Sequence, residues 1–270
     1  CFHSILPKPN KHQQHIMEKI IAKSCAVIAM SSTGRKLLMD VYGCDAQKTV
    51  VVHHGVPDFT FNDQSVAKKK LQVYSRYMML VSGLLGPGKG FEYAILALPH
   101  ILQAGIDVRL YIVGQTHPTI LQREDEHYRR YLQKLVQEQQ VEKAVVWVDR
   151  FLHLDELMEY YRAADIYITP HLDPQQPTSG TLAKALGAGK VCISTPFVYA
   201  AEMLKNDHGI LVPFRDAEAI ARAVIMVLKD MTLYETYRKN AYILGKTMQW
   251  PRVAKRYLDL FRIIIHNNQK

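Results

Sequence analysis

The sequence has little of what a membrane-spanning or disulfide-stabilised protein needs. No apolar run approaches the roughly 20 residues of a transmembrane helix, and the first residues do not show the pattern of a secretory signal. The four cysteines form no C-x-x-C pair or other metal-binding spacing. Cys25 and Cys192 fall in apolar, strand-like runs, where a thiol packs as a small hydrophobe. The sequence therefore predicts a soluble protein of a reducing compartment such as the cytoplasm.

Motifs for metal or nucleic-acid binding are also missing from the sequence. No Asp-x-Asp element follows a strand-like run, and no basic motif interleaved with aromatic residues is present. The chain is nevertheless basic, with a formal net charge of +9 and a pI of about 9.3. This charge favours phosphorylated substrates, an anionic membrane face or nucleic acid as partners. The lysine cluster at Lys68 to Lys70 is expected to be a solvated helix end.

What the sequence does have is a regular alternation of apolar runs and helical stretches. The runs are almost continuously hydrophobic and end near Ser82, Val113, Val148, Ile168 and Ser194. Buried parallel strands have this composition, and the intervening helices cover both faces of their sheet. The pattern predicts an α/β fold with a Rossmann-like, doubly wound parallel sheet. Ligands of such sheets bind beyond the carboxyl ends of the strands.

Two of the segments that follow strands have the features of phosphate-binding loops. The first, GLLGPGKG, contains Gly86 and ends in Lys89 and Gly90 at the expected start of a helix. The second, DPQQPTSGT, leads from turn-forming residues into a helix that opens at Ser179 to Thr181. A helix start with small residues presents free backbone N–H groups and the positive end of the helix dipole to an anion. Two such loops on one crevice indicate a diphosphate.

The remaining post-strand segments supply further candidates at the same edge. Gly114 begins GQTHP, Arg150 and Phe151 end the DRF segment, and His171 follows Pro170. His171 has a better claim than His117 to contact a ligand. The residues expected to be structural or solvated are His53, His54, Glu124, Asp125 and Glu126.

The motifs taken in order carry a resemblance to a known family. HHGVPD, GLLGPGKG, LYIVG, VVWVDRF, YYRAADIYITP, SGTLAKALGAGK and GILVPF resemble the carboxy-terminal, donor-binding half of glycosyltransferase family four, also called group 1. The resemblance runs from about residue 48 to residue 228. It implies a GT-B fold and a retaining, nucleotide-sugar-dependent transfer without a metal or another cofactor. It also implies that the loop around Thr178 and the helix from Gly180 hold the sugar and diphosphate of the donor.

The resemblance also implies a domain organisation. Residues 1–54 resemble the end of the amino-terminal, acceptor-side domain, residues 55–235 the donor-binding domain, and residues 236–270 helices that pack back on the first domain. CFHS resembles a strand end whose histidine lies beside the donor sugar, which implies His3 as a catalytic-site residue together with Gln176. The first domain is thus a partial second Rossmann-like domain. We expect a fragment of a longer protein, or a partner that covers the open sheet.

Three positions depart from the family pattern. The family usually has an arginine where this chain has Leu84, and two glutamates where it has Gln176 and Lys184. A glutamine still exchanges hydrogen bonds with sugar hydroxyls, whereas an ammonium cannot accept the bonds that a carboxylate accepts. Lys184 is therefore either a phosphate-binding cation that replaces the arginine or an outward helix residue of no importance.

These observations lead to a ranked set of functions. The first is a retaining hexosyltransferase that uses a nucleoside-diphosphate sugar, acts on a carbohydrate or a lipid-linked acceptor, and contacts the membrane peripherally if the acceptor is a lipid. The second is a non-catalytic nucleotide-binding or assembly module of the same fold, which the three departures favour. Nucleic-acid binding rests on net charge alone and is not expected. In each case the isolated chain is expected to transfer sugar poorly.

Overall fold

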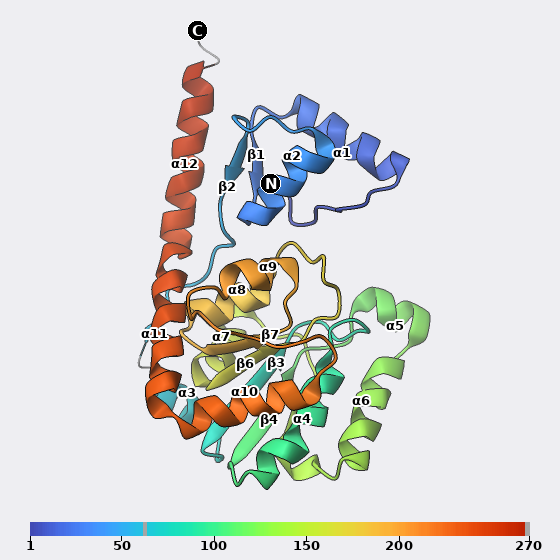
Figure 1. Cartoon of the computed structure of the whole chain (residues 1–270), viewed down its shortest axis with the longest axis vertical. Coiled ribbons are helices and arrows are strands. Elements are labelled where there is room, and N and C mark those ends of the chain that lie inside the picture. Colours follow the sequence, from blue (N-terminus) through green and yellow to red (C-terminus); the bar gives the residue numbers. More distant parts are fainter. Residues whose placement is uncertain (62–63, 268–270) are drawn as a thin grey trace.

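The computed structural model describes residues 1–61 and 64–267 of the chain, which form a small part and a larger part (Figure 1). The small part contains α1 (Lys11–Lys23), β1 (Val27–Ala29), α2 (Ser32–Tyr42) and β2 (Thr49–Val51). The larger part contains α3 (Gln64–Lys70), β3 (Tyr77–Ser82), α4 (Phe91–Gln103), β4 (Val108–Val113), α5 (Pro118–Glu124), α6 (His127–Glu138), β5 (Val145–Val148), α7 (Leu154–Ala163), β6 (Ile166–Thr169), α8 (Gly180–Gly187), β7 (Val191–Ser194), α9 (Val198–Met203), β8 (Ile210–Leu211), α10 (Ala217–Lys229) and α11 (Met231–Thr247). The last helix, α12 (Trp250–Asn267), returns to the small part.

The larger part is built on a six-stranded parallel sheet. Its strand order is β5-β4-β3-β6-β7-β8, so the chain builds outward from β3 in one direction and from β6 in the other. The predicted doubly wound parallel sheet is confirmed. A crevice opens at the point where the strand order reverses, because the crossover helices on its two sides lie on opposite faces of the sheet. The carboxyl ends of β3 and β6 therefore mark the place for a ligand.

Both faces of this sheet are buried, which explains why its strands are apolar at nearly every position. In β3, Met79 and Val81 belong to the core layer beneath α4, α6 and α10, while Met78 and Leu80 belong to the layer beneath α7 and α8. This alternation is the period of two that a strand imposes on its side chains. The core thus fixes the strand ends in two packed layers and holds the loops beyond them.

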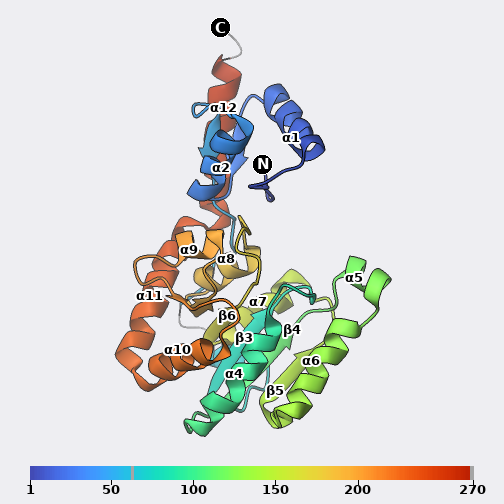
Figure 2. The same ribbon diagram turned by 45° about the vertical axis from the view of Figure 1, so that its right-hand side comes forward.

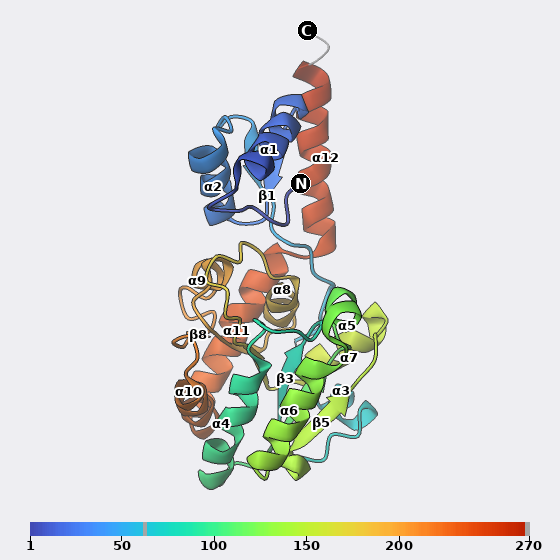
Figure 3. The same ribbon diagram turned by 90° about the vertical axis from the view of Figure 1, so that its right-hand side faces the viewer.

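The small part is a two-stranded parallel sheet with helices on both sides. Val27 of β1 lies opposite Thr49 of β2, and Val253 of α12 packs on this sheet from the side where α12 passes (Figure 3). Strand β1 spans only Val27–Ala29 and is shorter than the apolar run around Cys25 suggests. Cys25 lies before it and is exposed, so the expectation that it packs inside a strand is wrong. Cys192 is buried in β7 as predicted.

The chain passes between the two parts twice, and the two crossing segments are hydrogen-bonded to each other. The amide of Val56 donates to the carbonyl of Met248 at 2.9 Å, and the amide of Trp250 donates to the carbonyl of Val56 at 3.0 Å. Helix α11 packs on α8 within the larger part, and α12 alone runs beside the small part. The predicted boundary at residue 236 falls inside α11, and the observed crossing lies near residue 249.

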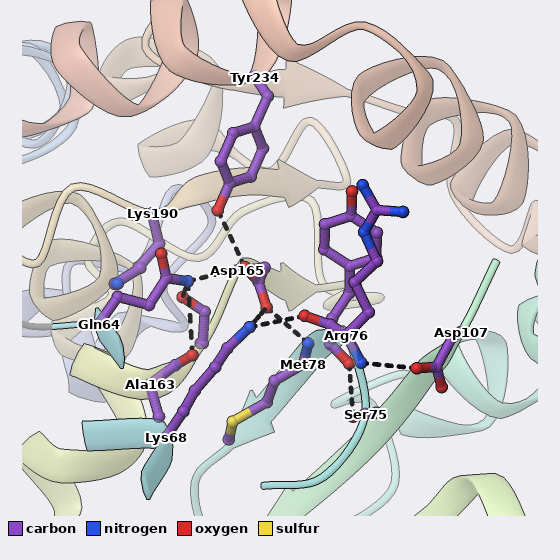
Figure 4. A network of polar contacts seen from close by, with 12 residues as sticks. Gln64, Lys68, Ser75, Arg76, Met78, Asp107, Ala163, Asp165, Lys190 and Tyr234 are labelled. Carbon is purple, nitrogen blue, oxygen red and sulfur yellow. Dashed lines mark hydrogen bonds and ion pairs between the residues drawn. The ribbon is translucent and has the colours of Figure 1, made fainter. Parts of the chain in front are cut away.

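A buried carboxylate organises the amino-terminal edge of the sheet, opposite the crevice (Figure 4). Asp165, only 4% exposed, accepts hydrogen bonds from the Met78 amide (2.7 Å), the Gln64 side chain (2.8 Å) and the Tyr234 hydroxyl (3.0 Å). Lys68 completes the set with an ion pair of 2.6 Å to the same carboxylate. A buried carboxylate needs such partners to remain charged. Lys68 is therefore a half-buried structural cation, which corrects the expectation of a wholly solvated lysine cluster. Asp63, where the sequence suggests that this helix begins, lies outside the described residues.

Candidate functional site

The two predicted phosphate-binding loops meet beyond the ends of β3 and β6. The amide of Leu172 in the second loop donates to the carbonyl of Gly88 in the first at 2.9 Å. Gly90, with a φ of +71°, begins α4 directly under Pro170, and a Cβ at this position would overlap the Pro170 carbonyl oxygen. Only glycine meets both demands, the left-handed backbone and the close approach. The glycine thus serves to bring the two loops together.

Helix α8 begins at this junction and presents free amides to it. Ser179 caps the helix, because its hydroxyl accepts a hydrogen bond from the Leu182 amide at 3.2 Å. Within the described residues, the amides of Gly180 and Thr181 have no hydrogen-bond acceptor. Unpaired amides in the first turn of a helix are suited to an anion. The helix start that the sequence predicts at Ser179 to Thr181 is therefore observed, and two donors remain beside the serine cap.

Lys89 lies at the same junction without an anionic partner. Its side chain is half-buried, and burial lowers the pKa of its ammonium group. In the part of the chain that the structure describes, no carboxylate lies within ion-pairing distance of Lys89. A half-buried cation without a partner has lost part of its hydration and gains most from a bound anion.

Lys184 occupies the next turn of α8 and is also half-buried. Its Nζ lies 3.4 Å from the Gly180 carbonyl oxygen, and burial lowers its pKa. Its charge lies close enough to His54 to lower the pKa of that imidazole. Lys184 is therefore half-buried near His54, and its role as a phosphate-binding cation stays a prediction.

A hollow of about 400 Å³ lies between the amino-terminal segment and the second loop. It brings together Lys89, His3, Gln176 and Thr178, four of the residues singled out in the sequence. The hydroxyl of Thr178 donates to the carbonyl of His3 at 2.9 Å and so joins the two walls. The hollow is open to solvent and has room for a sugar ring beside the ammonium of Lys89.

Gln176 and His171 form a braced pair in this wall. The side-chain amide of Gln176 donates to the Thr178 carbonyl at 2.9 Å, which directs its oxygen to the Nδ1–H of His171 at 2.8 Å. His171 is 5% exposed and stacks on Phe197, with ring centroids 5.1 Å apart. Burial, with the charge of Lys89, lowers the pKa of His171 to about 4, so the ring is neutral. His171 holds Gln176 in place and does not line the hollow itself.

A second hollow, of about 130 Å³, lies on the far side of the β3 and β4 ends. Gly114, Arg150 and Phe151 line it together with Leu84. Arg150 pairs with Glu156 at 2.8 Å through Nη1, and the ring of Phe151 is 67% exposed. The hollow is mostly apolar with an aromatic side chain at its rim, which suits a planar ring such as a nucleobase.

Other predicted residues have packing roles. Gly86 is buried, and a Cβ there would overlap Cδ1 of Ile120 of α5, so the end of that side chain would have to shift. His117 caps α5 by accepting a hydrogen bond from the Thr119 amide at 3.2 Å. Glu126, expected in a solvated loop, instead pairs with buried Arg129 at 3.0 Å.

Sequence reasoning missed His54, which the fold places at the start of α8. A Cβ at Gly180 would lie 2.8 Å from the Nε2 atom of His54, so the imidazole covers this glycine. The ring of His3 lies edge-on to that of His54, with centroids 6.3 Å apart. Its neighbour His53 instead bonds the Met30 carbonyl at 3.2 Å. A signal was present, since HHG precedes the crossing, but nothing local could show which histidine faces α8.

The position of His54 changes the meaning of Gly180. A bulky residue at Gly180 would block the approach of an anion to the backbone of the helix start. Because His54 covers this glycine, such a residue would also displace the imidazole. A Gly180 variant therefore cannot separate an anion-binding helix start from the packing between the two parts.

Helices α8 and α9 of the larger part lie next to the small part (Figure 2), and side-chain hydrogen bonds join the two parts around the candidate site. Besides Thr178 and His3, the hydroxyl of Ser31 donates to the Pro177 carbonyl at 3.3 Å. The carboxylate of Glu202 on α9 accepts hydrogen bonds from the Ser32 amide at 2.7 Å and from the amide and hydroxyl of Thr33 at 2.8 Å. A negative charge at the start of α2 is also favoured by the helix dipole.

The described residues do not gather three or more histidine, cysteine or carboxylate side chains as a metal site would require. None of the helices in the described ranges is long and apolar enough to cross a membrane.

The sequence is similar to those of known glycosyltransferases. The chain is 26% identical over 251 residues to a phosphatidyl-myo-inositol mannosyltransferase of Mycolicibacterium smegmatis and 25% identical over 259 residues to an uncharacterized glycosyltransferase of Methanocaldococcus jannaschii. Each match covers 92% of this chain, but only 58% and 63% of those proteins. The chain thus spans about 60% of the length of these curated relatives.

Solved structures show the same fold. HepE of Anabaena in complex with UDP and glucose matches 96% of this chain and 70% of its own, with a TM-score of 0.79 and 18% identity. Sucrose-phosphate synthase of Thermosynechococcus elongatus matches 98% of this chain and 65% of its own, with a TM-score of 0.78 and 22% identity. The GT-B architecture expected from the resemblance is confirmed by these matches. The family model of the group 1 glycosyl transferases matches residues 63–243, about two thirds of the sequence, and the chain belongs to that family.

Proposed function

We propose that this chain carries the donor site of a retaining hexosyltransferase that uses a nucleoside-diphosphate sugar. The observation that carries the proposal is Lys89, a half-buried ammonium without a carboxylate partner among the described residues, in the same hollow as Thr178, from which the chain leads into the free amides of Gly180 and Thr181. A diphosphate would pair with this set, its sugar would enter the hollow at His3 and Gln176, and its base the hollow at Phe151.

The main requirement of such a transfer is electrostatic stabilisation of the leaving diphosphate. The bond between the anomeric carbon and the diphosphate breaks, the acceptor oxygen bonds to the same face of that carbon, and the hydroxyl proton leaves with the diphosphate. Negative charge therefore grows on the leaving phosphate, where Lys89 and the amides of α8 would stabilise it, with Lys184 as a further cation. We propose that no metal is required, so a chelator should leave donor binding unchanged.

The acceptor is proposed from chemistry and relatives together. The mycobacterial relative is named for a phosphatidyl-myo-inositol acceptor, and a carbohydrate or lipid-linked acceptor hydroxyl fits a site between two domains. A protein with a lipid-linked acceptor would contact the membrane from its surface.

Calorimetry tests the proposal directly. Titration with uridine and guanosine diphosphates and with their glucose and mannose conjugates should show binding to at least one of them. Slow hydrolysis of the bound donor, or transfer to an added acceptor when a complementary amino-terminal domain is supplied, would support the enzyme. Absence of binding to every member of the panel would contradict the proposal.

A second candidate, a nucleotide-binding module without catalysis, is favoured by the three departures at Leu84, Gln176 and Lys184. Both the oxygen and the nitrogen of the Gln176 amide form hydrogen bonds within the loop, to His171 and Thr178. At Lys184 an ammonium group takes the place of a carboxylate. This candidate predicts donor binding without hydrolysis or transfer, even with the complementary domain present. The same experiments therefore decide between the two.

A further inference from the structure

His54 brings a hydrogen-bond acceptor, a ring nitrogen, to the start of α8. Its Nδ1 lies 2.8 Å from the carbonyl oxygen of Gly55. A carbonyl oxygen can only accept, so Nδ1 must carry the proton of this hydrogen bond. In the neutral ring the other nitrogen, Nε2, then has a free lone pair and acts as an acceptor.

The surroundings keep this ring neutral. Burial lowers the pKa of His54; the bond to Gly55 opposes this, and the nearby charges of Lys184 and His3 lower it further. No carboxylate contributes to the pKa of His54, so nothing on the facing elements favours its protonated form. Its position above Gly180 fixes where the Nε2 lone pair lies, at the first turn of α8.

The amides of Gly180 and Thr181 and the ammonium group of Lys184 lie near that position and can only donate hydrogen bonds, which suits phosphate oxygens. The hydroxyls of Ser179 and Thr181 can also accept, but they already face each other at 3.2 Å. A nucleotide sugar, however, also carries hydroxyl groups, which need an acceptor once they leave water. Nε2 of His54 supplies that acceptor beside the helix start.

We propose that His54 is a specificity-determining residue that accepts a hydrogen bond from a hydroxyl group of the bound nucleotide sugar. The proposal rests on the proposed function, since it assumes that a nucleoside diphosphate occupies the start of α8. The hydroxyl can belong to the ribose or to the transferred sugar, and the two sources are separated by the ligands used below. Lys184, one turn along α8 from Gly180, would then meet a phosphate or the same sugar ring.

The experiment compares ligands rather than variants first. Wild-type affinity is measured by calorimetry for uridine diphosphate, its 2′-deoxy and 3′-deoxy analogues, and uridine diphosphate glucose, and for the guanosine and mannose counterparts. If the ribose is the source, removal of one ribose hydroxyl should weaken binding by about two- to tenfold, the value of one neutral hydrogen bond. If the transferred sugar is the source, uridine diphosphate and its deoxy analogues should bind with equal affinity. Uridine diphosphate glucose should then bind more tightly than uridine diphosphate, and His54→Phe should reduce that difference.

The His54→Phe variant keeps an aromatic ring but lacks the acceptor. It should bind the ligand with the contacted hydroxyl and the ligand without it with the same affinity. His54→Asn, whose side chain has a carbonyl oxygen, should restore part of the difference in affinity between these two ligands. His53→Phe is the matched control, because His53 bonds the Met30 carbonyl inside the small part; it should discriminate as the wild type does.

Three results would overturn the inference. If the wild type binds the ligands with and without each hydroxyl equally well, His54 has only a packing role. The same holds if His54→Phe still distinguishes these ligands as strongly as the wild type does. If wild type binds none of the diphosphates, the proposed function fails and this inference fails with it. Binding of the diphosphates with unaltered discrimination leaves the proposed function intact and rejects His54 alone.

Discussion

Glu202 and Thr33 are joined by two hydrogen bonds of 2.8 Å across the boundary between the small part and the larger part. One comes from the backbone amide of Thr33 and the other from its hydroxyl, while the second carboxylate oxygen of Glu202 accepts from the Ser32 amide. The larger part thus supplies the cap for a helix of the small part. One carboxylate therefore accounts for three hydrogen bonds between the two parts.

We expect Glu202→Gln to loosen this boundary. A glutamine offers one oxygen and turns an amide group toward a backbone donor, so at least one of the three hydrogen bonds is lost. Hydrogen bonds to a charged group contribute about 1.5 to 3 kcal/mol, so amide exchange at Ser32 and Thr33 should rise roughly tenfold or more. Glu218→Gln, at an exposed carboxylate on α10, is the control. Equal exchange in both variants would show that Glu202 does not hold the boundary.

The pH dependence of the same contact has a definite sign. Burial opposes ionisation of Glu202, but the hydrogen bonds from Thr33 and Ser32 outweigh it and hold the pKa below its usual value of 4.5. A lowered pKa stabilises the boundary above pH 4.5 and loses that effect as the pH falls through the lowered value. The protection factor of the Ser32 amide, which compares its exchange rate with the intrinsic rate at the same pH, should therefore stay constant down to about pH 4.5 and fall below it.

Lys89→Ala should weaken binding of a nucleoside diphosphate far more than binding of the nucleoside. The ammonium contacts only the phosphates in the proposed pose, and such a bond contributes about 1.5 to 3 kcal/mol, or roughly ten- to hundredfold in affinity. Lys134→Ala removes one positive charge from an exposed side chain of α6 and should change neither affinity. Equal losses for diphosphate and nucleoside would remove Lys89 from the phosphate site.

Gly90→Ala should disrupt the junction of the two loops. The new methyl group would overlap the Pro170 carbonyl oxygen and also force a left-handed backbone on alanine. Gly88 has a positive φ as well, of +89°, but nothing lies within 4 Å of a Cβ there. Gly88→Ala therefore carries only the backbone cost, about 1 to 2 kcal/mol. Melting temperatures should fall clearly further for Gly90→Ala, and equal melting temperatures would contradict the close approach.

Lys190 should make stability rise with pH. It is 2% exposed, its ammonium donates to the Arg162 carbonyl at 2.7 Å, and burial, with the charge of Arg238, lowers its pKa from 10.5 to about 7. Between these values the unfolded chain binds more protons than the folded one, so the free energy of unfolding increases with pH.

A Lys190→Met variant removes the buried charge and keeps the length of the side chain. It should be stabilised relative to wild type at pH 7, by an amount that shrinks by on the order of 2 kcal/mol as the pH rises to 9. Denaturant unfolding at the two pH values measures this, with Lys229→Met at an exposed helix end as the control. Parallel pH profiles for wild type and Lys190→Met would contradict the prediction.

The apolar side chains exposed on α1 and α12 should govern association of the chain. Ile16 and Ile20 of α1 and Leu258, Phe261 and Ile265 of α12 are between 45% and 58% exposed. On α12, exposed apolar side chains of this kind mark a helix face that a further domain, a partner or a second copy covers.

Phe261→Lys should therefore lower the self-association of the purified chain, measured by sedimentation velocity at several concentrations. Leu121→Lys is the control, since Leu121 of α5 is 45% exposed but lies outside this surface. Equal sedimentation of both variants and wild type would show that the surface does not drive association.

Much of the larger part could be predicted from the sequence because its signals are local. A strand covered on both faces must be apolar at successive positions, as Met78 to Val81 are, and a helix start needs a side-chain acceptor such as Ser179. The phosphate-type loops follow from glycines whose backbone geometry other residues adopt only at a cost. These features depend on neighbours within a few residues, so the sequence by itself determined them, together with the crevice at the strand ends.

Only the tertiary structure decided which side chains meet across long stretches of chain. His54 faces Gly180, Glu202 caps Ser32 and Thr33, and Lys68 is tied to Asp165. Each pair joins residues about 100 or more positions apart, and each depends on how two packed layers or two domains are set against one another. A charged or titratable side chain takes its role from the burial and the partners it meets there. That environment is a property of the assembled fold, which is why a histidine expected to be structural stands at the candidate site.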